Sequence, residues 1–264
     1  MAGRVAASVG NLFAAFGAPV LALCAEVGGI LTLLFRVLFC LVPPRFDLDE
    51  TWRNLHKMGV KSVPIIVLTA FFTGGIMVIQ AAVFVKKFGA TSLVGWGAGY
   101  AVFREVGPML LGLMFSGRVG SNNTAELGTM VVTEQIDGLR ALSIDPVRYL
   151  LVPRVISMIV MLFLLTILGD VVAILGAALF GTVLADVSMA SFWVSFSQNV
   201  HVADVVHGLI KAAVFGFIVA LTSCHFGITV KGGAVGVGRA VNNAVVAAAL
   251  GIVLSDYLLT YALP

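Results

Sequence analysis

Long apolar stretches alternate with short polar segments along this chain, and the pattern predicts several membrane-spanning helices. A helix that crosses the hydrocarbon core of a bilayer needs about 20 mostly apolar residues. A further apolar stretch at 11–42 carries Glu26 and Arg36, so we expect a helix that lies in the membrane interface or is tilted through it. The predicted spans lie at 62–85, 92–117, 150–185, 208–230 and 241–262.

The predicted fold is therefore an all-α integral membrane protein. Residues 1–45 would form the N-terminal interfacial helix, and residues 46–264 would form a domain of five transmembrane helices. The mixed segment 186–207 would hold a short amphipathic helix on the surface. A glycine-rich turn at Lys231–Arg239 would connect the fourth and fifth spans.

Composition agrees with the bilayer as the solvent of this 264-residue chain. Hydrophobic residues make up 60% and charged residues 11% of the sequence, whereas soluble domains carry about 25% charged residues. The mean hydropathy is +1.07. The sequence contains no basic run suited to nucleic acid, so we exclude nucleic acid as a partner.

The sequence contains little that points to catalysis by this chain. No Gly-Lys pair occurs, which excludes a phosphate-binding P-loop. The four histidines lack the spacing of a zinc site, and the three cysteines lie in apolar stretches without metal-ligand spacing. We therefore predict no catalytic residue, no metal site and no cofactor bound by this chain.

Basic residues are distributed unequally between the two sides of the predicted membrane domain. If the segment 118–154 faces the cytoplasm, ten of the sixteen lysines and arginines lie on that side. Lys86 and Lys87 lie on the opposite side, and Lys211 is ambiguous. Since cytoplasmic loops are enriched in lysine and arginine, we predict the N-terminus on the cytoplasmic side and the C-terminus on the other.

A polar segment at 104–146 interrupts the apolar pattern, and it begins with two charges inside the second predicted span. Charged residues within a span are costly and usually face a bundle interior, a partner or a cavity. Arg104 and Glu105 are adjacent, about 100° apart on a helix, so they cannot pair ideally with each other. Either they line a cavity for a polar or amphipathic substrate, or another span satisfies each charge. For Asp170 and Asp256, which also lie in spans, we favour a structural role.

The end of this polar segment predicts a short helix outside the membrane. Residues 133–146 mix apolar and acidic side chains, and Asp145-Pro146 would end the helix. Glu134 and Asp137 lie near its N-terminal end, where acidic residues stabilise a helix. Such an amphipathic helix in a cytoplasmic loop suits docking onto a soluble protein.

Several motifs closely resemble the MlaE/YrbE permeases, which are membrane subunits of ABC-type lipid transporters that work with MCE proteins. The resemblance extends over most of residues 60–262, whereas the first 45 residues add little to it. Its motifs are Glu105-Val-Gly-Pro108, Gly117-Arg118-Val-Gly120, Ala125-Glu126-Leu-Gly128-Thr-Met130, Thr133-Glu134-Gln135-Ile136-Asp137, Asp145-Pro146 and Pro153-Arg154.

This resemblance implies an assembly in the bacterial inner membrane. Two copies of the chain would form a homodimer that encloses a lipid cavity, with the C-terminus on the periplasmic side. An MlaF-like ABC ATPase on the cytoplasmic face would bind ATP and Mg²⁺. A ring of MlaD-like MCE-domain proteins would lie on the periplasmic side. The resemblance also allows a small MlaB-like accessory subunit in the cytoplasm.

The resemblance further implies two functional sites. Arg104, Glu105 and Phe88 would belong to the lipid cavity. A coupling helix at about 133–142 would contact the ATPase. The sequence Ser-Asn-Asn-Thr at 121–124 is more polar than in many relatives, and its role stays unassigned. The residues expected to couple the permease to the ATPase are Glu134, Gln135, Asp137, Leu139 and Arg140.

The implied function is that of a permease subunit, not itself an enzyme, in an ATP-driven transporter. It would move phospholipid between the inner membrane and periplasmic MCE proteins and so maintain outer-membrane lipid asymmetry.

Two alternatives from other classes are open. One is a secondary transporter driven by an ion gradient, with Arg104, Glu105 and Asp170 as its relay. The other is a non-transporting membrane scaffold of an envelope complex. Co-purification of a nucleotide-binding subunit would distinguish the first function from both.

Overall fold

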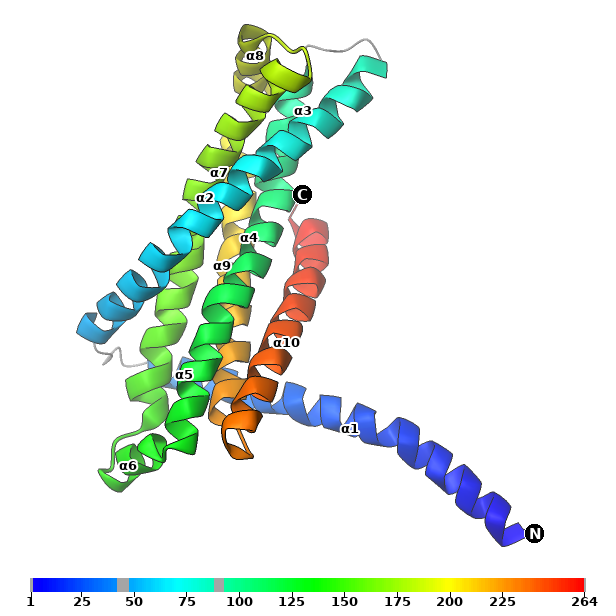
Figure 1. The fold of residues 1–264 in the computed structure, drawn as a ribbon, viewed down its shortest axis with the longest axis vertical. Coiled ribbons are helices and arrows are strands. Elements are labelled where there is room, and N and C mark those ends of the chain that lie inside the picture. Colours follow the sequence, from blue (N-terminus) through cyan, green and yellow to red (C-terminus); the bar gives the residue numbers. More distant parts are fainter. Residues whose placement is uncertain (1, 42–47, 88–92, 264) are drawn as a thin grey trace. The chain divides into compact units, whose positions relative to one another are not determined.

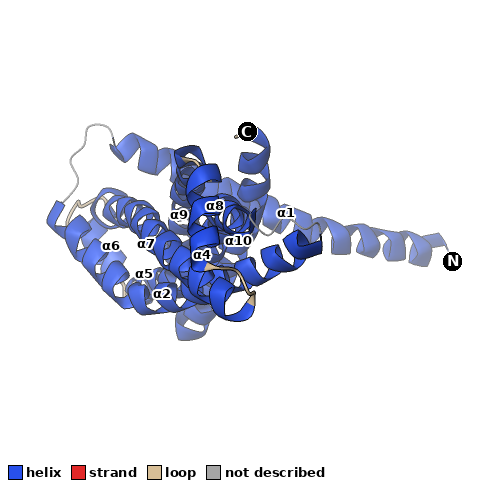
Figure 2. Cartoon of the chain, turned by 90° about the horizontal axis from the view of Figure 1, so that it is seen from above, coloured by secondary structure: helices blue, strands red, loops and turns tan. Residues whose placement is uncertain are grey.

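The computed structural model describes residues 2–41, 48–87 and 93–263. Every regular element in these ranges is a helix, and the loops between them are short (Figure 2). The chain divides into two compact units, 1–45 and 46–264. The predicted all-α membrane class is confirmed, because five of these helices are long and apolar enough to cross a membrane.

The N-terminal unit consists of one helix, α1 (Ala2–Leu41). Its segment Val20–Cys40 has the length and hydropathy of a membrane span, although Glu26 and Arg36 lie within it. The interfacial position that the sequence predicts for this helix stays a prediction.

Four long apolar helices form most of the larger unit, and they coincide with four of the five predicted spans. The first begins earlier than predicted, because the polar residues from Leu48 onward belong to the same helix as the apolar stretch. Asp49 and Glu50 lie in its first turn, where negative charge favours the helix N-terminus. The four are α2 (Leu48–Lys87), α7 (Val152–Leu184, preceded by the π-helical turn η4, Val147–Leu151), α9 (Val202–Ile228) and α10 (Gly233–Ala262).

The remaining predicted span, 92–117, lies in a helical run that contains two π-helical turns. The Gly107 N–H bonds to the carbonyl of Val102, a five-residue step that widens the helix. Pro108 follows, and a proline has no N–H with which to continue a regular ladder. The run comprises α3 (Val94–Ala101), η2 (Val102–Val106), α4 (Gly107–Phe115), η3 (Ser116–Gly120) and α5 (Ser121–Val132).

This run continues beyond the predicted span and includes the polar stretch 121–124 as the start of α5. The Ser121 hydroxyl donates to the Gly117 carbonyl at 2.5 Å, and the Thr124 hydroxyl donates to the Gly120 carbonyl at 3.0 Å. These bonds to the preceding turn satisfy the polar side chains without breaking the helix. A stretch that reads as a polar interruption in the sequence is therefore part of a continuous helical segment.

Helices α2 and α7 lie side by side along the bundle (Figure 1). A Cβ atom built on Gly74 would lie 1.8 Å from the Ala173 carbonyl oxygen, and one on Gly176 would lie 2.2 Å from the Phe71 carbonyl oxygen. Small residues at such crossings let two backbones approach closely within the membrane. Glycine at these two positions therefore sets the distance between the two helices.

The two ends of the bundle carry different short helices (Figure 1). At one end, α8 (Met189–Asn199) packs on α3 through buried Phe192, and the Trp96 N–H donates to the Ser195 hydroxyl at 3.1 Å. This helix lies within the segment 186–207, where the sequence predicts a short helix. At the opposite end lies α6 (Gln135–Ala141), within the predicted coupling segment.

The turn between α9 and α10 is shorter than predicted. The sequence predicts a glycine-rich turn over Lys231–Arg239, but α10 already begins at Gly233. The left-handed backbone is confined to Gly232, with a φ of 88°, and Gly233, with a φ of 67°. Gly236, in the first turns of α10, is buried, and a Cβ atom built on it would lie 2.0 Å from the Lys231 carbonyl oxygen. Glycine at this position therefore allows the start of α10 to pack against the turn.

We predict that Gly74→Ala destabilises the protein, because the added methyl group must push α7 away from α2. Overpacking of this kind typically costs about 1–3 kcal/mol, so the thermal unfolding temperature in detergent should fall. Gly238→Ala is the matched control, since a Cβ atom there meets nothing within 4 Å. Equal unfolding temperatures for the two variants would contradict the close approach.

Candidate functional site

A buried lysine forms the centre of a charged network between η2, α9 and α10. The Lys211 side chain is fully buried. Its Nζ atom lies 2.7 Å from Glu105 Oε2 and 2.9 Å from Asp256 Oδ1, and it donates to the Thr260 hydroxyl at 2.7 Å. An isolated ammonium group would be very costly in such a place. Two carboxylates and one hydroxyl replace the water that Lys211 has lost.

Arg104 belongs to the same region but faces different partners. Its guanidinium lies 2.9 Å from His207 Nδ1 and 3.7 Å from Asp204 Oδ1. It also donates to the Tyr100 hydroxyl at 3.1 Å and lies over the Tyr100 ring, 5.2 Å from its centroid. As expected from their angular separation, Arg104 and Glu105 do not pair with each other. Each is held by charges on α9.

The sequence interpretation missed the partners on α9. Asp204 and His207 were placed in a surface segment, and Lys211 was left ambiguous, whereas all three lie on one face of α9. Their spacing of three and four residues is the signal that could have identified a shared helical face. The charged face therefore comprises Asp204, His207 and Lys211 opposite Arg104 and Glu105.

Both alternatives weighed for Arg104 and Glu105 have physical support in this arrangement. Other spans satisfy both charges, as the structural alternative requires. The side chains nevertheless stay partly accessible, at 17% for Arg104 and 37% for Glu105, while that of Lys211 is at 0%. The network thus presents its carboxylate and guanidinium groups outward and keeps its ammonium inside. Phe88, the third predicted cavity residue, lies outside the described residues.

Asp170 lies on the other side of the π-helical turn η2. It is 4% exposed, and neither carboxylate oxygen has a hydrogen-bond partner among the described residues. Its Oδ1 atom would lie 2.9 Å from a Cβ atom built on Gly107, so glycine makes room for the carboxylate at this turn. Asp256, by contrast, is paired with Lys211, as a structural role predicts.

The predicted coupling residues lie in and just before α6. Glu134 adopts a left-handed conformation, with a φ of 58°, directly before the helix. Asp137 and Arg140 form an ion pair at 2.8 Å on the exposed surface, and Ile136 is buried. Beyond the helix, Leu142 is 73% exposed. This element therefore offers charged and apolar groups to a partner at the end of the bundle opposite α8. Gln135 and Leu139 lie in the same helix.

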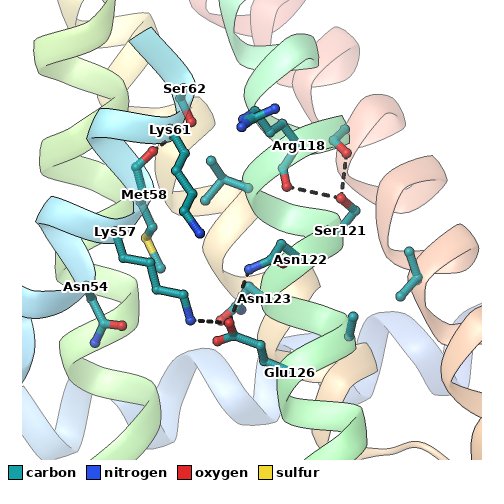
Figure 3. A pocket seen from close by; sticks show the side chains of 14 residues that line it. Asn54, Lys57, Met58, Lys61, Ser62, Arg118, Ser121, Asn122, Asn123 and Glu126 are labelled. Carbon is teal, nitrogen blue, oxygen red and sulfur yellow. Dashed lines mark hydrogen bonds and ion pairs between the residues drawn. The ribbon is translucent and has the colours of Figure 1, made fainter. Parts of the chain in front are cut away.

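A second polar site lies near the α6 end, in a cavity of about 660 Å³ between α2, η3 and α5 (Figure 3). Glu126 forms an ion pair with Lys57 on one side and with Arg154, at 3.2 Å, on the other. Asn123 accepts from Arg154 at 2.8 Å and donates to the Ser223 hydroxyl at 2.9 Å. The unassigned 121–124 stretch thus connects α5 to α7 and α9.

The long apolar helices, the buried ionic network between them and the exposed helix α6 at one end of the bundle define a multi-pass membrane protein. A family model described as "Permease MlaE" matches residues 51–262. The chain belongs to the MlaE permease family. It is a transporter permease subunit, and a permease of the ABC class works with an ATPase partner.

Similar proteins occur in bacteria and in a plant. A probable ABC transporter permease protein of Rickettsia conorii is 39% identical over 235 residues, covering 89% of this chain and 91% of the relative. A probable ABC transporter permease protein of Synechocystis is 36% identical over 226 residues, covering 86% of each. The chloroplastic protein TRIGALACTOSYLDIACYLGLYCEROL 1 of Arabidopsis thaliana is 37% identical over 216 residues, covering 79% of this chain and 61% of the relative.

We predict that Lys211→Met strongly destabilises the protein, because Glu105 and Asp256 would face each other without a cation. Removing one partner of a buried ion pair costs about 3–5 kcal/mol. The yield of folded protein and the thermal unfolding temperature in detergent measure this loss. Adding Asp256→Asn should recover part of it. Lys87→Met, which removes an exposed cation, is the control. Wild-type stability of Lys211→Met would contradict the network.

Proposed function

We propose that this chain is the membrane subunit of an ATP-driven lipid transporter, with phospholipid as its cargo. The observation that carries the proposal is the charged network that joins Arg104 and Glu105 of η2 to α9, a helix long and apolar enough to cross a membrane. Charges at this depth are costly and usually serve a pathway or a cavity. A phospholipid combines an ionic headgroup with apolar chains, so it suits a surface that joins charged groups to apolar helices.

The name of one similar protein supports a lipid cargo. The Arabidopsis relative is named after a galactosylated diacylglycerol, which is a lipid. Membership of the MlaE family supports transport driven by ATP and favours it over an ion gradient or a scaffold role. ATP and Mg²⁺ would bind to the MlaF-like partner ATPase. The cargo would pass between the inner membrane and MlaD-like MCE proteins, which would maintain outer-membrane lipid asymmetry.

The proposed ATPase contact is α6 together with Glu134, at the end of the bundle opposite α8 (Figure 1). The helix combines an exposed ion pair, Asp137–Arg140, with exposed Leu142 close behind it. Such a combination suits a protein interface that takes up rigid-body motion from a soluble subunit. In the orientation predicted from the basic residues, the α6 end would face the cytoplasm. The C-terminus would face the periplasm, where the MCE ring would lie.

Two copies of the chain would complete the pathway. In the proposed homodimer, Arg104 and Glu105 of each copy would contribute to one shared lipid cavity. Closure of the ATPase dimer on ATP binding would move the coupling helices and, with them, the spanning helices. A small MlaB-like subunit would bind on the cytoplasmic side. The movement of the spanning helices would change whether the cavity opens to the bilayer or to the MCE proteins.

We predict that Glu134→Lys uncouples the permease from its ATPase, because it reverses a charge at the proposed contact. Lipid-stimulated ATPase activity of the reconstituted complex should fall about tenfold or more, since like charges at an interface cost several kcal/mol. Asp186→Lys is a closely matched control, because Asp186 is also an exposed acidic residue with positive φ (53°). If both variants kept wild-type activity, the assignment of α6 would be wrong.

We predict that Glu105→Gln lowers the rate of lipid transfer but leaves the ATPase bound to the permease. The amide keeps the shape of the side chain and removes the charge that faces Lys211. Transfer of a fluorescent phospholipid from proteoliposomes to the purified MCE protein measures the effect. Asp186→Asn makes the same chemical change at an exposed site outside the network. Unchanged transfer with Glu105→Gln would remove this residue from the lipid pathway.

A further inference from the structure

The cavity at the α6 end of the bundle has an excess of positive charge. Three cations line it, and Glu126 is the carboxylate among its lining residues. That carboxylate is already shared between Lys57 and Arg154. Lys61 and Arg118 have no ion-pair partner among the described residues. They extend from α2 and η3 toward the same space (Figure 3).

Several other polar groups of the cavity are already engaged. The Ser62 hydroxyl donates to the Met58 carbonyl at 2.7 Å, and the Asn122 amide donates to Glu126 at 3.2 Å. The Ser121 hydroxyl donates to the preceding turn. Lys61 and Arg118 therefore supply the unpaired charged donors of the cavity among the described residues, and their side chains carry no acceptor. Such a cavity selects an anion with several acceptor oxygens.

The position of the cavity indicates what carries this anion. Its lining from α2 ends at Ser62, where the apolar stretch predicted to cross the membrane begins. The cavity thus lies where the helix passes from water into hydrocarbon, which is the depth of the lipid headgroups. A basic pocket between transmembrane helices on the cytoplasmic side is a typical site for a phosphate-bearing headgroup. Its volume of about 660 Å³ can hold a headgroup.

We propose that this cavity binds a phosphate group through Lys61 and Arg118, and that a phospholipid of the cytoplasmic leaflet supplies it. The inference rests on the proposed function in that phospholipid is the cargo. It adds a headgroup site at the α6 end, where the proposed coupling helix lies, separate from the network of Arg104 and Glu105. Lys57 stays paired with Glu126 and holds α2 against α5 beside the site.

Native mass spectrometry of the detergent-purified complex can test this proposal. The probes are dioctanoyl phosphatidylglycerol, inorganic phosphate and dioctanoylglycerol, which lacks phosphate. We expect Lys61→Gln and Arg118→Gln each to weaken phosphatidylglycerol binding about tenfold, since each removes charge-assisted hydrogen bonds. Binding of dioctanoylglycerol should not change. Lys61→Arg should restore binding. Lys231→Gln, an exposed cation at the same end but outside the cavity lining, should bind like wild type.

The outcomes distinguish a lipid headgroup from inorganic phosphate as the source of the anion. They also test this site independently of the proposed function. Tighter binding of phosphatidylglycerol than of inorganic phosphate supports the headgroup; equal binding would overturn the lipid source. Wild-type binding by both glutamine variants, or an equal loss in Lys231→Gln, would overturn the site itself. Thermal unfolding of each variant verifies its fold. These measurements need no ATP, so a failure of the coupling prediction at Glu134 leaves their result intact.

Discussion

The burial of Lys211 is the constraint on which the arrangement of the charged spans depends. An ammonium group that has lost all its water requires carboxylates close to it, and Glu105 and Asp256 supply them from η2 and α10. The three elements must therefore meet at one depth and in one register. Buried ion pairs add little net stability, but their disruption is costly. The network accordingly specifies the position of α9 and α10 against η2 and leaves most of the packing energy to apolar contacts.

Packing elsewhere in the bundle relies on a different device. Between α2 and α7 the backbones approach each other through Gly74 and Gly176, where no side chain separates them. In lipid, where apolar side chains gain nothing from leaving water, such van der Waals contact drives helix association. The bundle thus combines a close, apolar contact between α2 and α7 with a polar contact between η2, α9 and α10. The polar contact carries Arg104 and Glu105, the groups that we propose face the cargo.

The sequence predicted the spans and α6 well, because both follow from local periodicity and apolar length. A helix was expected at about 133–142, and α6 occupies Gln135–Ala141, whereas its role in coupling stays a prediction. The contacts of Lys211 could not be predicted, since Glu105 lies 106 residues away and no local pattern joins them. The 121–124 stretch stayed unassigned, because a hydroxyl that bonds to its own preceding turn looks polar in sequence yet fits a helix. Asn123 gained its role through Arg154, another contact distant in sequence.

The π-helical turn η2 connects these observations. It widens the helix at the residues from which the Arg104 and Glu105 side chains extend, and Pro108 follows without an N–H to donate. Charged groups occupy one side of this turn, and buried Asp170 lies against Gly107 on the other. A widened turn has fewer regular hydrogen bonds to lose than the flanking α-helical segments, so a rearrangement there costs less. In this helical run, which extends toward α6, motion received at that end would reach the π-helical turn η3 first and then η2. The charged network would then respond to a partner that binds at the opposite end of the bundle.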